Sequence, residues 1–240
     1  MVQTSLQEGK RNRLLALCSE DDYQRLVSDS IVSSLPLYKE LYRAGEPMDA
    51  IYFPLDCVVS VLVGSGADEP KVEMATIGNE GAVGVYAVLN EARAIGTNIV
   101  QVGGDALRIS VMSFKERVRD HAGIHDLMHQ YMYALTHQIV QAGACNRLHT
   151  MEERCARWLL MMHDRTDKQN STFPLTQEFL AEMLGVRRAT VNLAIGILKN
   201  AGFIEYVRGQ ITIVDRVGLE SASCACYDLI RKEYETLHVD

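Results

Sequence analysis

The chain has 240 residues, of which 48% are hydrophobic and 23% are charged, and its formal net charge is −7. This apolar content excludes a disordered or low-complexity protein, and the length suits two domains better than one. The most apolar stretches, such as residues 57–63 and 155–162, are far shorter than the ~20 residues that a bilayer requires, so we predict no membrane span.

The cysteine content and residues 1–13 indicate the cellular compartment of the protein. Six cysteines in a chain of this length, with no apolar export signal in residues 1–13, predict reduced thiols and a cytoplasmic protein. The acidic net charge argues weakly against nucleic acid as the partner. The local distribution of arginine therefore decides that question.

The first half of the chain is predicted to contain a few short helices followed by several strands. Residues 14–32 have helical spacing and predict small flanking helices, whereas short apolar runs alternate with glycine turns from 37 to 110. Several short strands with regular turns predict a β-sandwich or small barrel. We assign the fold class α+β, with an N-terminal jelly-roll β-barrel over residues 1–112. The predicted strands are residues 51–54, 58–63, 72–77, 99–102 and 106–109.

A long helix follows the strands. Apolar residues recur with a helical period, and a helix over residues 123–146 would extend about 36 Å. A helix of this length with one apolar stripe needs a partner that buries the stripe, so we predict that residues 113–146 form a dimerisation helix. The stripe consists of Leu127, Met128, Tyr131, Leu135, Ile139 and Ala142.

Residues 147–240 form the third predicted part. Residues 155–162 predict an apolar helix, and the polar residues 164–172 predict a loop. Two helices and a hairpin follow, and residues 219–237 predict a final helix.

Residues 175–214 carry the clearest functional pattern. Thr176 is a suitable N-cap for a first helix, and Gly185 tolerates the positive φ of a tight turn. A second helix then runs to about Gly202, a residue type suited to the position after a helix end. Two helices joined by a short glycine turn predict a helix-turn-helix.

The start of the second helix predicts a DNA contact. Arg187 and Arg188 lie at the positive end of the helix dipole, where each charge costs ~0.3–1 kcal/mol unless a polyanion neutralises it. A hairpin over residues 203–207 and 210–214, with Arg208 at its tip, would contact the DNA backbone as a wing. The predicted DNA-binding residues are Thr176, Gln177, Arg187, Arg188, Ala189, Thr190, Asn192, Leu193, Lys199 and Arg208.

The pattern LAEMLGVRRATVNLAIGILKNAGFIEY (residues 180–206) closely resembles the winged helix of the CRP/FNR family of bacterial transcription regulators. The order of barrel, long helix and helix-turn-helix is also similar, and so is the early turn at residues 43–46 followed by the run 51–53. The resemblance spans about residues 35–214. It implies a homodimer formed through the long helix, an effector site in the barrel and a two-fold symmetric operator.

The recognition helix departs from the family at two positions. Relatives that read a guanine-containing half-site carry a glutamate and a second arginine where this chain has Ala189 and Leu193. Arg188 is then the remaining base reader, with Asn192 suited to adenine and Leu193 to a thymine methyl. We therefore expect an operator that differs from the family consensus.

The barrel departs from the cyclic-nucleotide-binding members of the family. The candidate effector residues are Gly84, Val85, Arg93 and Ala94. The resemblance implies a glutamate after Gly84 and an arginine near position 94, but Val85 and Ala94 stand there and Arg93 is one residue away. A cyclic phosphate would lack its charge-assisted hydrogen bonds, so we expect no cyclic nucleotide. The effector stays unidentified.

The potential metal ligands give no assigned site. His121, His125 and His129 repeat every four residues, a spacing that suits a metal, but we interpret them as a solvated helix face. Cys224 and Cys226 are closer than a CxxC chelate. The resemblance implies clustered N-terminal cysteines for an iron–sulfur sensor, which this chain lacks, and no local motif favours haem. We interpret the cysteines as buried apolar residues: Cys18, Cys57, Cys145, Cys155, Cys224 and Cys226.

The sequence thus predicts a homodimeric, sequence-specific DNA-binding transcription regulator. We expect no enzymatic activity, since the chain contains no constellation of nucleophile and base or of paired carboxylates. The expected partners are double-stranded DNA, a second copy of the chain and RNA polymerase, without a membrane. The alternative is a small-molecule or metal-binding sensor whose C-terminal helices contact protein.

Overall fold

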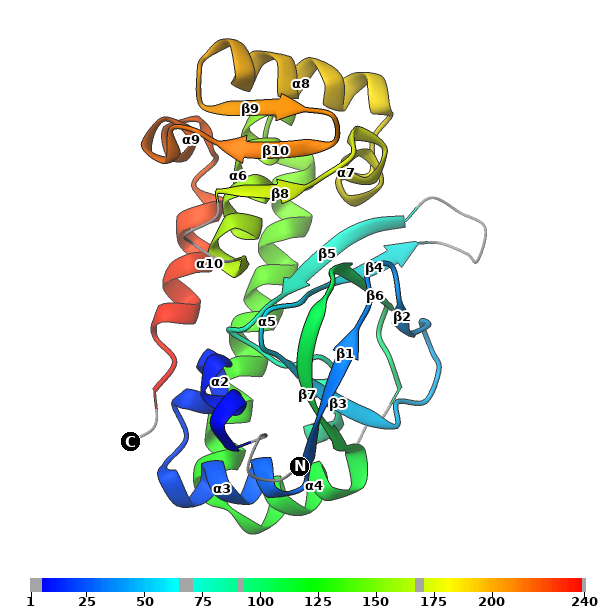
Figure 1. Cartoon of the computed structure of the whole chain (residues 1–240), viewed down its shortest axis with the longest axis vertical. Coiled ribbons are helices and arrows are strands. Elements are labelled where there is room, and N and C mark those ends of the chain that lie inside the picture. Colours follow the sequence, from blue (N-terminus) through cyan, green and yellow to red (C-terminus); the bar gives the residue numbers. More distant parts are fainter. Residues whose placement is uncertain (1–5, 65–70, 90–92, 167–170, 239–240) are drawn as a thin grey trace. The chain divides into compact units, whose positions relative to one another are not determined.

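The computed structural model describes residues 6–64, 71–89, 93–166 and 171–238. It is an α+β structure, as predicted, with most strands in the first half of the chain and most helices in the second (Figure 1). Within these residues no helix is both long and apolar enough to cross a membrane. Residue contacts divide the chain into two compact units, described separately below. Unit 1 comprises Met1–Val61, Thr76–His137 and Lys232–Asp240, and unit 2 comprises Leu62–Ala75 and Gln138–Arg231.

The strands of the first half form two sheets. One sheet has the order β1-β7-β3 and the other β2-β6-β4-β5. Among the described residues the two sheets share no strand, so the predicted barrel is an open jelly-roll sandwich. The strands are β1 (Ser30–Leu35), β2 (Glu40–Tyr42), β3 (Ala50–Pro54), β4 (Val58–Gly64), β5 (Lys71–Ile77), β6 (Thr97–Val102) and β7 (Gly104–Ser110).

The first strand corrects the prediction of helices over residues 14–32. Short helices do occupy the start of this stretch, but β1 begins at Ser30 and pairs antiparallel with β7, from Ser30–Ile109 to Leu35–Gly104. Ile31 and Val32 are exposed on that strand, so their apolar character does not mark a buried helix face. The short helices of this half are η1 (Gly9–Arg11), α2 (Arg13–Ala16), α3 (Glu20–Ser28) and η2 (Val85–Leu89).

The long helical stretch is divided in two. His121 has φ −132° and ψ 108°, an extended conformation that ends one helix before the next begins. The second helix contains the predicted residues 123–146, and its 27 residues extend about 40 Å. The two helices are α4 (Val111–Asp120) and α5 (Ala122–Leu148).

The hairpin and the C-terminal helices as far as Arg231 lie in unit 2. A third strand, β8, joins the predicted hairpin to give the order β8-β10-β9, although the sequence assigned its first residue to a loop. Residues 167–170 of that loop lie outside the described residues. The predicted final helix 219–237 is two helices, because Ser223 is extended. The elements are α6 (Met151–Arg165), β8 (Thr172–Pro174), α7 (Gln177–Leu184), α8 (Arg188–Asn200), β9 (Ile204–Val207), β10 (Gln210–Ile213), α9 (Arg216–Ala222) and α10 (Cys226–Glu235).

Helix α6 forms the centre of unit 2. It begins at a capping box in which Thr150 and Glu153 satisfy each other's backbone amides, and its residues Trp158, Leu159 and Leu160 are buried. It packs against α8 and α9. This buried helix therefore supports α8, the second helix of the helix-turn-helix.

Candidate nucleic-acid interface

Helix α7 begins and ends as the sequence predicts. The Thr176 Oγ1 accepts a hydrogen bond from the Phe179 amide at 3.1 Å, which caps the first turn. Gly185 has φ +65°, and its amide and that of Val186 donate to the carbonyls of the last turn, forming a Schellman motif. The chain therefore turns sharply from α7 into α8.

The N-terminus of α8 has two arginines and no side-chain cap. Arg187 occupies the N-cap position without capping the helix, and Arg188 is the first helical residue. Both side chains are exposed. The uncapped amides and the helix dipole already favour an anion here, and the two guanidinium groups add positive charge. This end of α8 is suited to bind phosphate or a base edge.

The exposed face of α8 follows from its buried face. Val191, Ala194, Ile195 and Leu198 pack inward. The outward face begins at the helix N-terminus, and its Leu193 is 69% exposed. The residues of this face are Arg188, Ala189, Thr190, Asn192 and Leu193.

Two of the remaining predicted DNA-binding residues, Gln177 and Lys199, lie outside the exposed face at the N-terminal end of α8. The Gln177 Nε2 donates to the Asn192 Oδ1 at 2.9 Å, which joins the start of α7 to the exposed face of α8. Lys199 is exposed in the last turn of α8. That position is about 16 Å along the helix from Arg188, so Lys199 does not belong to the cluster at the N-terminus.

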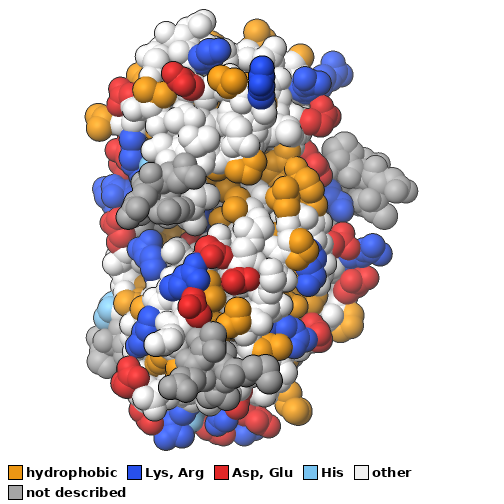
Figure 2. Space-filling model, in the orientation of Figure 1, with side chains coloured by type: hydrophobic (Ala, Val, Ile, Leu, Met, Phe, Trp, Pro, Cys, Tyr) orange, Lys and Arg blue, Asp and Glu red, His pale blue; other side chains and the backbone are white. Residues whose placement is uncertain are grey.

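The hairpin after α8 presents an arginine at its tip. Strands β9 and β10 pair antiparallel up to the pair Val207–Gln210. Arg208 has φ +49° and Gly209 has φ +75°, the two positive values that a type I′ turn requires. Arginine is uncommon at such a position and costs about 1–2 kcal/mol relative to a right-handed conformation. Its exposed charge is consistent with a contact to a ligand outside the chain. Figure 2 shows basic side chains along α8 and this hairpin.

A buried arginine that the sequence analysis missed supports the turn. The Arg154 Nη2 donates to the Leu184 carbonyl oxygen at 2.6 Å and to the Asn146 Oδ1 at 3.0 Å. The charge of Arg154 thus lies at the negative end of α7, a favourable position. Its only sequence signal was an arginine within an apolar helix.

The candidate effector residues lie in unit 1. Gly84 has φ +88° and precedes the fully buried Val85 of η2. Arg93 is exposed and forms an isolated β-bridge with Pro47, and Ala94 is buried beside it. The described pocket of about 210 Å³ in this unit is lined by other residues: Arg13, Leu14, Leu17, Glu80, Tyr234, Glu235 and Leu237.

The predicted dimer stripe of α5 is buried in its own chain. Leu127, Met128, Tyr131, Leu135 and Ala142 are each 3% exposed or less, and Ile139 is half-buried. The large apolar side chains that α5 exposes lie on its opposite face. These are Tyr133, Val140 and Leu148.

The histidine series does not form one helical face. His121 lies outside α5, with its Nδ1 3.6 Å from the Asp22 Oδ1. His125 and His129 do share α5, where the His125 Nδ1 contacts Asp126 at 2.9 Å and the two rings stack at 4.1 Å. No group of three metal-ligating side chains in the described part of the chain includes these histidines.

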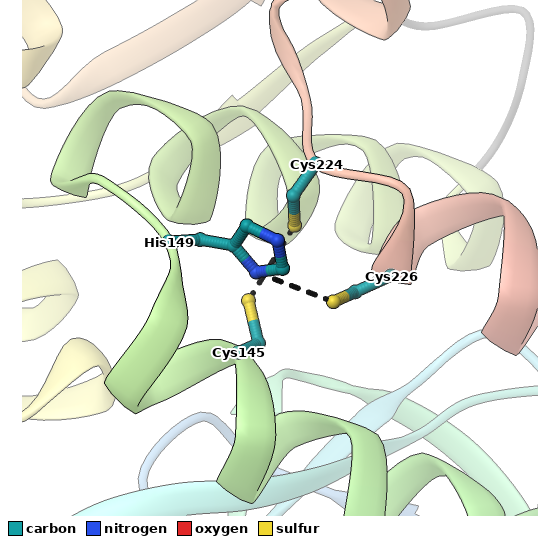
Figure 3. Close-up of side chains that lie close together, drawn as sticks. All are labelled: Cys145, His149, Cys224 and Cys226. Carbon is teal, nitrogen blue, oxygen red and sulfur yellow. Dashed lines mark hydrogen bonds between the residues drawn. The ribbon is translucent and has the colours of Figure 1, made fainter.

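Three cysteines and one histidine that are distant in the sequence lie close together in the structure. Cys145, His149, Cys224 and Cys226 offer ligand atoms that all lie within 4.8 Å of one another (Figure 3). Cys145 is 79 residues from Cys224, so no local motif joins them. The available signals were the i, i+4 spacing of Cys145 and His149 and the nearby pair of cysteines.

Known proteins match the C-terminal domain and the fold. Residues 153–222 match the family model of the Crp-like helix-turn-helix domain. No curated protein sequence matches the chain. The structure of FixK2 from Bradyrhizobium japonicum has a TM-score of 0.70 at 16% identity, over 82% of this chain and 98% of that one.

Two further solved structures show the same fold. A putative transcriptional regulator of the CRP/FNR family from Eubacterium rectale has a TM-score of 0.66 at 13% identity, covering 89% of this chain and 98% of that one. TTHB099, a CRP-family transcriptional regulator from Thermus thermophilus, has a TM-score of 0.65 at 17% identity, covering 80% and 96%. The predicted order of sandwich, long helix and helix-turn-helix is therefore confirmed.

Proposed function

We propose that the chain is a homodimeric transcription regulator of the CRP/FNR type that binds a two-fold symmetric operator, and its Crp-like helix-turn-helix domain and its fold support this proposal. The N-terminal end of α8 enters the major groove. The β9–β10 hairpin contacts the adjacent backbone as a wing.

The observation that carries the proposal is the pair of arginines at the start of α8. Their side chains are exposed and the helix end is uncapped, so no residue in the described ranges is seen to compensate this positive charge. A nucleic-acid backbone supplies the missing negative charge. Leu193 is placed on the same outward face, where a thymine methyl would cover it.

The second copy of the chain binds to the exposed face of α5. Tyr133, Val140, Ala144 and Leu148 are exposed at near-helical spacing, whereas the stripe predicted from the sequence already packs inside the chain. A symmetric contact between two such helices covers these apolar residues. It also sets the distance between the two recognition helices.

The remaining expectations are part of the proposal. The protein acts in the cytoplasm without catalytic activity, and a bound dimer contacts RNA polymerase beside the operator. Val85 and Ala94 are buried at the positions where the family resemblance implies ribose and phosphate contacts, respectively, which disfavours a cyclic nucleotide. The proposal therefore assigns no cyclic nucleotide to unit 1.

The test begins with selection of bound DNA from a random-sequence pool by the purified protein, with and without cell extract. We expect enrichment of two-fold symmetric sites, with half-sites about 34 Å apart or a multiple of that distance.

Arg188→Ala should weaken the binding free energy on the selected site by about 1–3 kcal/mol and reduce the base preference at one position of that site. Arg187→Ala should weaken all sequences alike and reduce the salt slope by about 0.9 for each phosphate that the arginine neutralises in the wild type.

Arg231→Ala is the matched control, because Arg231 is an exposed arginine of unit 2 that lies on α10 rather than α8. Its DNA affinity should equal that of the wild type. Equally weakened binding of selected and random DNA by both α8 variants would rule out base reading by Arg188. If no site is enriched either with or without cell extract, the proposal that the protein is a DNA-binding regulator is wrong.

A further inference from the structure

Four side chains from two distant segments converge in unit 2. Cys145 lies in the last turn of α5 and His149 directly follows that helix, while Cys224 precedes α10 and Cys226 begins it. The three cysteines are buried and His149 is half-buried. Figure 3 shows the three sulfur atoms and the imidazole ring directed toward one another.

The distances match a tetrahedral metal site. The Cys145 and Cys224 sulfur atoms are 3.4 Å apart, and the Cys226 sulfur is 3.5 Å from the His149 Nδ1. With Zn–S bonds of about 2.3 Å and Zn–N bonds of about 2.0 Å, the edges of a tetrahedron are about 3.8 Å between sulfurs and about 3.5 Å from sulfur to nitrogen. An ion therefore fits with small side-chain adjustments.

The surroundings favour thiolates. The Gln141 Nε2 donates to the Cys226 sulfur at 3.1 Å, a bond that stabilises a charged ligand. The thiolate is the form of cysteine that binds metals.

Two buried cations balance the charge of such a site. Arg154 and Arg157 are buried, and among the described residues their Nε atoms have no hydrogen-bond partner. The guanidinium of Arg157 interacts with the Cys145 thiol, and that of Arg154 with the Cys145 and Cys224 thiols. Three thiolates around a divalent ion leave one negative charge in excess, which these cations neutralise.

We propose that Cys145, His149, Cys224 and Cys226 form a Cys₃His site for a thiophilic divalent cation of the zinc class. Soft thiolate and imidazole ligands in tetrahedral arrangement select such ions over magnesium or calcium. Binding displaces the protons of the thiols that are still protonated, without oxidation or reduction.

The site joins the two ends of the DNA-binding domain. The first two ligands precede and the last two follow residues 153–222, which form the Crp-like helix-turn-helix domain. The ion thus links the segment that enters this domain to the segment that leaves it. Because the ligands lie together only in the folded unit, metal binding also stabilises that unit.

The experiment measures metal directly. The full-length protein, purified under reducing conditions, should contain about one zinc ion per chain. After chelation, cobalt(II) titration should give the absorption bands of tetrahedral cobalt and of thiolate-to-cobalt charge transfer. Cys224→Ala should abolish both the tetrahedral-cobalt bands and the charge-transfer bands. Cys155→Ala is the matched control, since Cys155 is a buried thiol of the same unit outside the cluster, and it should retain both spectra.

Two further variants keep the test decisive if Cys224→Ala does not fold. His149→Cys replaces a half-buried ligand by another, so it should keep tetrahedral cobalt with a stronger charge-transfer band. Gln141→Leu should weaken cobalt binding about 10–100-fold.

Three results would overturn the site. These are a wild-type protein without a thiolate–cobalt spectrum, a spectrum unchanged by both Cys224→Ala and His149→Cys, and a Cys145–Cys224 disulfide in metal-free protein isolated without air.

Discussion

Helices α5 and α8 both leave one face exposed, but the chemistry of the two faces is opposite. The exposed face of α8 begins with Arg187 and Arg188, whereas that of α5 carries Tyr133 and Val140. A basic face at an uncapped helix end suits a polyanion, and an apolar face along a long helix suits a second apolar surface. The residues that a helix leaves uncovered thus indicate the kind of partner it binds.

The two helices also differ in how well periodicity predicts their outward face. On α8 the apolar spacing coincides with the buried side, because α6 covers that side within the same unit. On α5 the spacing identified an apolar stripe but not what buries it. Leu135 packs inside its own chain, and the large apolar residues that α5 exposes are a second, smaller set.

The largest expected effect tests the buried face of α5. Leu135 is 2% exposed, so Leu135→Ala should lower the free energy of unfolding by about 2–5 kcal/mol in urea titrations monitored by circular dichroism. The dimer constant of the protein that remains folded should not change. Unchanged stability with a dissociated dimer would restore the stripe first predicted from the sequence.

The next effect tests the exposed face of α5. Val140 is 64% exposed, and Val140→Glu places like charges at a symmetric contact. We expect the dimer dissociation constant from sedimentation equilibrium to rise at least about tenfold, or about 1.4 kcal/mol. The free energy of unfolding of the monomer should change by less than about 0.5 kcal/mol.

Met112→Glu is the control for this variant, since Met112 is 71% exposed but lies on α4. It should leave the dimer intact. Equal dissociation in both variants would mean that added charge, rather than the face of α5, weakens association.

The smallest effect concerns the tip of the wing. Arg208→Gly removes a side chain from a residue with φ +49° and also removes its charge. The stability of the protein should rise by up to about 1 kcal/mol, while the salt slope of DNA binding should fall by about 0.9 for each phosphate that Arg208 neutralises. A filter-binding series over salt concentration measures the second quantity. An unchanged slope would show that the wing does not contact the backbone.

Local patterns predicted the helix-turn-helix and its hairpin but not the cluster of Cys145, His149, Cys224 and Cys226. The N-cap at Thr176, the glycine turn and the hairpin each depend on a few neighbouring residues, so the sequence contains the whole signal. Cys145 and Cys224, which are 79 positions apart, meet only after the segment between them has folded. The split at His121 and the strand at Ser30 were missed because apolar spacing does not report backbone pairing.

The same cluster places the entry and the exit of the helix-turn-helix domain at one point, since the Cys145 and Cys224 sulfur atoms are 3.4 Å apart. A segment whose ends adjoin is suited to circular permutation and to insertion into a loop of another protein. We therefore expect residues 145–226 to tolerate insertion into a loop of another protein, with both junctions at the cluster.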